Sequence, residues 1–229
     1  MEKKNGKTLV IGAHYDDTAW CWAGLVSLLV ENGVEVDEAV LTDTNHRGIG
    51  EIRKQEQLKM MGVLGMGILY AVGEENKFKD GYLDQVGIKV ISQAIIGLLL
   101  KAEKENHPYT KIITFGKEGF TGHHDHKHLA KAVKRAFEHK KNHAVKELWQ
   151  VGMTPQEREL WPQDYFVPIP EINLKGYRPI GISKAFDKKI EAIAAHKTQF
   201  EIPGGGGRAH IERLSQLPKV EWFKVYRRK

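Results

Sequence analysis

Two short clusters of histidine and aspartate follow two apolar, strand-like segments, and this pairing constrains the fold more than any other feature. The first cluster, residues 13–17, comes directly after the apolar run 8–12. The second cluster, residues 122–126, comes shortly after the apolar run 112–115. In an open α/β sheet, ligands bind outside the carboxyl ends of the strands. We therefore expect the two clusters to face one crevice at that edge of a sheet.

The order of the predicted strands and helices indicates an α/β fold. Short apolar runs rich in Val and Ile predict buried strands, and apolar residues at helical spacing predict the helices between them. Their alternation is typical of a Rossmann-like, mostly parallel sheet with helices on both faces. We predict strands at 8–13, 34–42, 68–72, 111–115, 147–151, 165–170 and 220–226, helices at 20–32, 53–61, 83–104, 126–139 and 184–195, and a flexible glycine-rich loop at 203–208.

The composition is typical of one soluble globular domain, which we predict to span residues 1–229. Cys21 is the only cysteine, so the chain has no intramolecular disulfide and no cysteine-based zinc cluster. This fits a reducing compartment and predicts a cytoplasmic protein. The longest apolar stretch, residues 95–100, is too short to cross a bilayer, so we expect no integral membrane segment.

The net charge of +6 is compatible with nucleic-acid binding, but the lysines and arginines are scattered and no basic block is interleaved with aromatic residues. We therefore predict no nucleic-acid partner. A mild positive field equally suits an acidic or phosphorylated small molecule. The sequence leaves the oligomeric state open, so a homo-oligomer remains an option.

The residue types of the two clusters suit a metal site. His14 and Asp17 are three residues apart in a turn, and His126 opens a predicted helix. Together they supply two imidazoles and one carboxylate and leave a fourth zinc position for water, while Asp16 is a spare carboxylate that can act as a base. Taken singly, each cluster also has a structural explanation: a buried hydrogen-bonded histidine with a helix cap at 16–17, or a solvated histidine-rich turn.

Four segments carry a further pattern: residues 14–18 (His-Tyr-Asp-Asp-Thr) with Ala23-Gly24 after them, 50–56 (Gly-Glu-Ile-Arg-Lys-Gln-Glu), 123–126 (His-His-Asp-His) and 195–199 (Ala-His-Lys-Thr-Gln). In order and spacing they resemble motifs of the PIG-L/LmbE-like zinc N-deacetylases. These enzymes remove acetyl groups from N-acetylglucosamine-containing molecules. The resemblance covers nearly the whole chain, and it implies an N-acetylated amino-sugar substrate.

The resemblance also implies roles for matching residues of the segments 14–18 and 123–126. His14, Asp17 and His126 would bind one zinc ion per chain, and Asp16 would be the general base. The reaction would be hydrolysis of an N-acetyl amide, a linear amide C–N bond.

Three further roles follow from the same resemblance. His123 would assist the tetrahedral intermediate and the departing amine, and Asp125 would orient His123. Arg53 would contact the sugar or its substituent. The alternative for Arg53 is a surface ion pair with Glu51 or Glu56, which would contribute little.

The chain departs from the family motifs at three positions. Tyr15 and His124 replace prolines, and Thr18 replaces a glutamate. Trp20 and Trp22 crowd the usual glycine region, and aromatic walls there could stack on a sugar face. We expect the ligands and the base to support catalysis despite these departures.

Two other functions are alternatives to the deacetylase. A metal-dependent phosphohydrolase of the His-Asp type belongs to an all-helical class, and the strands predicted before both clusters argue against it. A non-enzymatic metal- or nucleic-acid-binding module would need no base, so Asp16 beside a complete ligand set argues against it. His196 and Gln199 remain ambiguous, because they either reach the site or only tie the last helix to the first loop.

Overall fold

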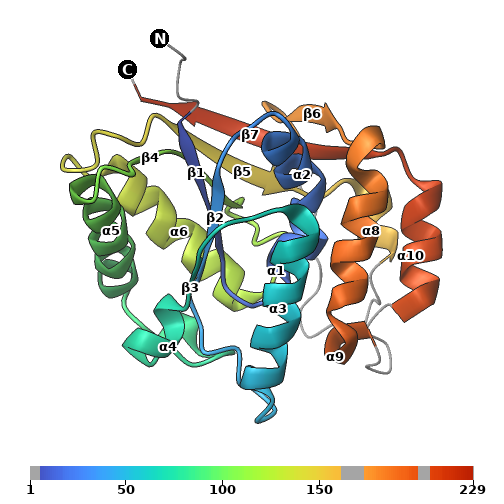
Figure 1. The fold of residues 1–229 in the computed structure, drawn as a ribbon, viewed down its shortest axis with the longest axis horizontal. Helices are drawn as coiled ribbons and strands as arrows, with labels where there is room; N and C mark the ends of the chain where they lie inside the picture. The colour runs from blue at the N-terminus through green and yellow to red at the C-terminus, as the bar shows by residue number, and fades with distance from the viewer. Residues whose placement is uncertain (1–5, 161–172, 201–206, 229) are drawn as a thin grey trace.

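The structure is a computed structural model that describes residues 6–160, 173–200 and 207–228, and these residues form a seven-stranded sheet covered by helices (Figure 1). The strand order is β3-β2-β1-β4-β5-β7-β6. The first five strands in this order are parallel, and β7 is antiparallel to both of its neighbours. The strands are β1 (Lys7–Gly12), β2 (Val36–Val40), β3 (Leu69–Tyr70), β4 (Tyr109–Phe115), β5 (Glu147–Gly152), β6 (Arg178–Gly181) and β7 (Val220–Arg227). The predicted α/β class with a mostly parallel sheet is confirmed.

Helices cover both faces of the sheet, as predicted. Figure 1 shows α5 and α6 on one side and α2, α3 and α8 on the other. The helices are α1 (Asp17–Cys21), α2 (Ala23–Glu31), α3 (Gly50–Leu64), α4 (Val72–Asn76), α5 (Ile88–Lys104), α6 (His124–Glu138), α7 (Pro155–Leu160), α8 (Phe186–Ala195), α9 (Lys197–Phe200) and α10 (Gly207–Gln216), with 3-10 turns η1 (Leu83–Gln85) and η2 (Ser183–Ala185).

The strand order brings the two polar clusters together. The chain runs outward from β1 through β2 to β3, and then returns across the sheet through α5 to β4, on the other side of β1. The carboxyl ends of β1 and β4 are therefore the topological switch point, where such sheets bind ligands. Both strands are buried on both faces: Leu9, Val10, Ile11, Ile112 and Ile113 have no exposed surface. Their rigid ends hold the loops that carry the two clusters.

The helix predicted at 20–32 is two helices, because the chain breaks at Trp22. This residue has non-helical backbone angles (φ −148°, ψ 18°) between α1 and α2. Its indole is fully buried, donates from Nε1 to Oγ1 of Thr18 (2.8 Å) and packs on Phe115 with ring centroids 5.0 Å apart. The apolar ring fills the space beneath the first cluster, and helix continuity is lost there.

Other differences lie at element ends. The strand predicted at 68–72 is only β3, since α4 begins at Val72, and the helix predicted at 83–104 begins as the turn η1. Residues Gly207 and Arg208 of the predicted glycine-rich loop begin α10 instead. The rest of that loop and the strand predicted at 165–170 lie outside the described residues. Among the helices of the described ranges, none has the length and apolarity needed to cross a membrane.

Gly73 lets α4 lie directly against the backbone that supports the first cluster. A Cβ at Gly73 would lie 2.2–2.4 Å from the carbonyl carbon, Cα and nitrogen of Thr42. Thr42 in turn donates to the carbonyl oxygen of Ala13, from its amide (3.0 Å) and from its hydroxyl (2.7 Å). Any side chain at Gly73 must therefore push α4 away from the sheet edge.

We predict that Gly73→Ala lowers the free energy of unfolding by about 1–3 kcal/mol through overpacking. The matched control is Gly97→Ala in α5, where an added Cβ has nothing within 4 Å. That change should stabilise by about 0.5–1 kcal/mol, since alanine favours helix. Urea unfolding followed by circular dichroism measures both, and equal stabilities of the two variants would contradict the close packing at Gly73.

Candidate metal centre

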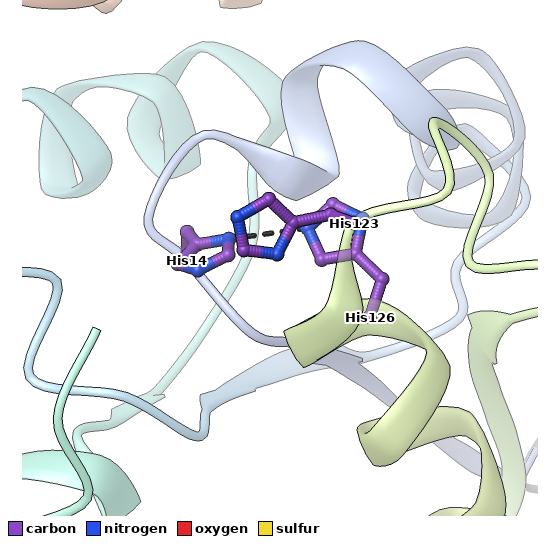
Figure 2. Close-up of side chains that lie close together, drawn as sticks. All are labelled: His14, His123 and His126. Carbon is purple, nitrogen blue, oxygen red and sulfur yellow. Dashed lines mark hydrogen bonds between the residues drawn. The ribbon is translucent and has the colours of Figure 1, made fainter. Parts of the chain in front are cut away.

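His14, Asp17 and His126 converge at the carboxyl ends of β1 and β4. Nδ1 of His14 lies 3.1 Å from Nε2 of His126, the contact drawn as a dashed line in Figure 2. Oδ1 of Asp17 lies 3.1 Å from the same Nε2, and Oδ2 of Asp17 lies 3.7 Å from Nδ1 of His14. Ligand atoms bound at ~2.0–2.1 Å to a tetrahedral zinc ion lie roughly 3.3 Å from one another. The spacing of the three side chains therefore fits one ion of that size.

Both imidazoles use their outer nitrogens for other contacts. Nε2 of His14 lies 3.2 Å from carboxylate oxygens of Asp125 and of Asp80. Nδ1 of His126 lies 3.1 Å from the carbonyl oxygen of Gly119. A neutral imidazole must donate its one N–H to these acceptors, so its lone pair faces inward. Metal-ligating histidines typically donate their outer N–H in this way.

The carboxylate of Asp17 is also fixed from outside. Its Oδ2 accepts hydrogen bonds from the backbone amides of Ala13 and His14, both at 2.7 Å. Its Oδ1 is left to face His126. When both rings are neutral, two imidazole lone pairs and a carboxylate oxygen are thus three buried acceptor atoms that lie close together with no donor among them. A cation satisfies all three at once, so the residues present fit a metal ion.

The pKa values of His14 and Asp17 are shifted by the same close contacts. Burial opposes the charged form of His14, yet its contacts with Asp125, Asp17 and Asp80 raise its pKa well above the usual range. Burial likewise opposes ionisation of Asp17, yet His126 and His14 hold its pKa well below the usual range. The cluster has an excess of acceptors and stabilises positive charge at its centre.

His123 forms an alternative ligand set with His14 and His126, because nitrogen atoms of the three rings lie within 4.8 Å of one another (Figure 2). Nδ1 of His123 accepts from the backbone amide of Asp125 (3.2 Å) and so caps the N-terminus of α6. Burial lowers the pKa of His123 to about 3, helped by the positive charge of the neighbouring histidines. His123 is therefore a neutral ring with its proton on Nε2, which makes it a hydrogen-bond donor.

The carboxylate of Asp125 does not orient His123, contrary to the expected role. It is fully buried and accepts from the backbone amides of Gly81 and Leu83, both at 2.8 Å. Its Oδ2 contacts Nε2 of His14 (3.2 Å), and only its backbone amide reaches His123. Asp125 therefore orients His14, because the loop after α4 turns the carboxylate toward the first cluster.

Arg53 lies inside the site and is only 8% exposed. Its Nη2 donates to Oδ1 of Asp16 (2.9 Å), and its Nη1 donates to Oδ2 of Asp80 (3.3 Å). The alternative of a surface ion pair with Glu51 or Glu56 is therefore wrong. Asp16, the predicted base, is held beside the three candidate ligands by this arginine.

Asp80 is the site residue that the sequence analysis missed. It contacts Nε2 of His14 (3.2 Å) and Arg53, and so joins the candidate ligands to the pair formed by Arg53 and Asp16. Its backbone amide donates to Asp43 (2.9 Å), and Gly81 turns the chain after it with φ +81°. The available signal was an Asp-Gly turn after the third strand, at the same edge of the sheet as the two clusters.

The three departures from the family motifs brace the site from outside. Each side chain bonds to a neighbouring segment: Tyr15 to Glu74 of α4 (2.5 Å), Thr18 to Glu38 of β2 (2.6 Å) and His124 to the carbonyl oxygen of Gly81 (2.7 Å). Tyr15 and Trp22 have no exposed surface. The expectation that Trp22 stacks on a sugar face is therefore wrong, whereas Trp20 is partly buried and this expectation stays a prediction for its ring.

Comparison with known families agrees with this fold and site. The family described as PIG-L: GlcNAc-PI de-N-acetylase matches residues 9–137, which include both clusters and Arg53. The chain belongs to the PIG-L family, and the family predicted from the four motifs is confirmed.

The individual relatives share only low sequence identity with this chain. The chain is 26% identical over 229 residues to a probable N-acetyl-alpha-D-glucosaminyl L-malate deacetylase 2 of Bacillus cereus, covering 95% of this chain and 94% of the relative. It is similar in fold to the N,N'-diacetylchitobiose deacetylase of Pyrococcus horikoshii (TM-score 0.68, 15% identity, 96% of this chain and 84% of the other). It is also similar in fold to the 4-carboxy-2-hydroxymuconate hydratase of Pseudomonas putida (TM-score 0.61, 15% identity, 97% of each chain). One fold thus serves different reactions, and the function must be argued from the site.

We predict that the purified protein holds one divalent ion per chain and that His126→Ala loses most of it, since a site with three protein ligands cannot spare one. The matched control is His128→Ala on the same helix, whose Nε2 contacts the carbonyl oxygen of Val86 instead (2.8 Å). His123→Ala should also keep the ion. Elemental analysis after dialysis measures all three, and loss of the ion from His123→Ala would make His123 a ligand in place of Asp17.

Proposed function

We propose that the protein is a zinc-dependent hydrolase that removes the acetyl group from an N-acetylglucosamine-type sugar or sugar conjugate. The zinc ion would be held by His14, Asp17 and His126. The observation that carries the proposal is the convergence of three buried side chains on one point. Their other polar atoms already have hydrogen-bond partners outside the site, such as the carbonyl oxygen of Gly119 for His126 and the amide of Ala13 for Asp17. Two imidazoles and one carboxylate with a fourth position left over are typical of catalytic zinc. Membership of the PIG-L family and the deacetylase names of its relatives support the same reaction.

Asp16 is suited to be the general base. A zinc ion at this site would lower the pKa of a bound water toward ~7 and polarise the acetyl carbonyl. Asp16 would take the proton from the attacking water. Arg53 fixes Oδ1 of Asp16, and Oδ2 has no contact of its own among the described residues, so it is available for that proton.

His123 would act as a neutral donor to the oxyanion of the tetrahedral intermediate. Its Nδ1 accepts from the backbone amide of Asp125, so the proton lies on Nε2. A neutral imidazole can stabilise an oxyanion by hydrogen bonding, and it need not be protonated first. Because the pKa of His123 is lowered to about 3, the proton for the departing amine would come back from Asp16. The products are acetate and the free amine.

Arg53 would contact the sugar or its substituent. Each of its two Nη atoms carries two N–H bonds, and the contacts with Asp16 and Asp80 use one on each. The remaining donors can bind hydroxyl groups of a sugar at the same edge of the site.

The direct test is acetate release from a panel of substrates. We expect the zinc-loaded protein to release acetate from N-acetylglucosamine or from one of its O-linked conjugates. A phosphomonoester and an unrelated N-acetyl amide such as an N-acetyl amino acid serve as controls. Phosphate release with no acetate release from any amino sugar would contradict the proposal.

We predict that Asp16→Asn keeps its metal and lowers kcat by at least ~10²-fold, because the amide has the same shape but cannot accept a proton. The matched control is Asp43→Asn, a carboxylate next to Asp80 that is not proposed to touch substrate. Acetate release and metal content are measured together. A kcat near that of the unchanged protein would remove Asp16 from the mechanism.

The localisation, the domain organisation and the partners of the protein are predicted from its sequence. We propose a cytoplasmic enzyme made of a single domain over residues 1–229, with one small-molecule substrate and no nucleic-acid partner. The reasons are the single cysteine and the scattered basic residues. A homo-oligomer is compatible with all of the observations above.

A further inference from the structure

His196, directly after α8, is a buried histidine whose ring has no hydrogen-bond partner in the part of the chain that the structure describes. It is 1% exposed, and neither Nδ1 nor Nε2 has a partner among the described residues. Leaving a buried polar group unpaired costs about 1–3 kcal/mol, so such groups normally have a partner, often a buried water. The position of His196 therefore calls for a bonding partner that is not another side chain of the described residues.

The backbone around His196 is held in place on both sides. Its amide donates to the carbonyl oxygen of Ile193 (3.1 Å). Two residues later, Thr198 donates from its amide (2.8 Å) and its hydroxyl (2.5 Å) to the carboxylate of Glu56 on α3. This contact joins the fourth motif to the motif that carries Arg53. The backbone that carries the buried imidazole is thus fixed against α3.

The pair formed by Arg53 and Asp16 contains a second unpartnered group, on the same helix α3 that Thr198 contacts. Nε of Arg53 is buried and has no partner among the described residues, although both Nη atoms are engaged. Asp16 and Arg53 both act electrostatically on the His196 ring, which burial keeps neutral by lowering its pKa. A neutral imidazole has one donor and one acceptor, and Arg53 Nε has one donor. A water molecule between them would accept from Arg53 Nε and donate to the ring of His196.

We propose that His196 is a positioning residue for the pair formed by Asp16 and Arg53, joined to Nε of Arg53 by a buried water. The water completes the hydrogen bonds of the guanidinium and holds its plane. The guanidinium in turn fixes the carboxylate that would take the proton from the attacking water. Contacts of this kind, one step removed from the reacting atoms, typically change activity 10–100-fold. The kinetic consequence rests on the proposed deacetylase function, whereas the water and the geometry of the pair do not.

The test compares three variants of the full, metal-loaded protein. His196→Phe keeps an aromatic ring without nitrogen atoms, and His196→Gln keeps one donor and one acceptor. Thr8→Val is the matched control, since Thr8 Oγ1 is also buried and unpartnered but lies at the other end of β1. Each variant is measured for thermal stability, metal content, kcat and KM, and crystal structures are determined for the unchanged protein and for His196→Phe.

We expect His196→Phe to fold, keep its metal and lose roughly 10-fold or more in kcat with little change in KM. His196→Gln should recover most of that kcat, and Thr8→Val should behave as the unchanged protein. The crystal structure should show a water within hydrogen-bond distance of both the His196 ring and Arg53 Nε. A His196→Phe protein with unchanged kcat and higher stability would make His196 a core residue only and overturn the proposal.

The crystallographic comparison separates this proposal from the proposed function. If the unchanged protein releases no acetate from any amino sugar, the deacetylase proposal fails. The positioning role then stands if His196→Phe loses the bridging water and the contact between Arg53 Nη2 and Asp16 shifts. It falls if no water bridges the two groups, or if that contact is the same in both structures. If His196→Phe fails to fold, the crystal structure of His196→Gln decides the same question. The proposal stands if the glutamine bonds to Arg53 Nε directly or through a water, and it falls if the glutamine has no such link.

Discussion

Repulsion among three buried acceptor atoms, which arises when both histidines are neutral, is the constraint on which the site depends. Nδ1 of His14, Nε2 of His126 and Oδ1 of Asp17 face one another, and the chain commits the outer atoms of all three residues to other partners. Such an arrangement is unfavourable unless a cation lies among the acceptors. The structural explanation of the first cluster does not account for it. Asp16 stands at the N-cap of α1, yet its side chain makes no capping hydrogen bond there.

A continuous set of contacts connects the candidate ligands to the candidate base. It runs from Asp125 to His14, from His14 to Asp80, from Asp80 to Arg53 and from Arg53 to Asp16. Elements from both sides of the switch point therefore fix the base relative to the metal centre. The single positive charge of Arg53 is shared between two carboxylates. Arg53 is therefore already neutralised by Asp16 and Asp80. An acidic group on a substrate would need another positively charged residue to pair with.

The sequence predicted the parts of the site that depend on local pattern and on topology. Apolar runs located β1 and β4, and the strand-end argument brought His14, Asp17 and His126 together. It could not predict Asp80 or the true partner of Asp125, because these depend on how the loop after α4 approaches the other strands. Local periodicity carries no information on which acceptor meets which donor. The break at Trp22 was missed for a similar reason, since burial of its ring outweighs helix propensity.

The buried hydrogen bonds beneath the site show how this chain accommodates Thr18 where the family motif has glutamate. Trp22 donates to Thr18, and Thr18 and Gln57 both bond to the carboxyl group of Glu38, which β2 brings to this place. Burial raises the pKa of Glu38 to about 8, despite those two hydrogen bonds. Oε1 of Gln57 has no partner among the residues that the structure describes, and the oxygen and nitrogen of such an amide are assigned only from their contacts. If the amide is turned so that its oxygen faces Glu38, a neutral Glu38 can donate to that oxygen, and the amide NH2 then takes the place that has no partner among the described residues. In its neutral form Glu38 adds no negative charge beneath the aspartates of the site.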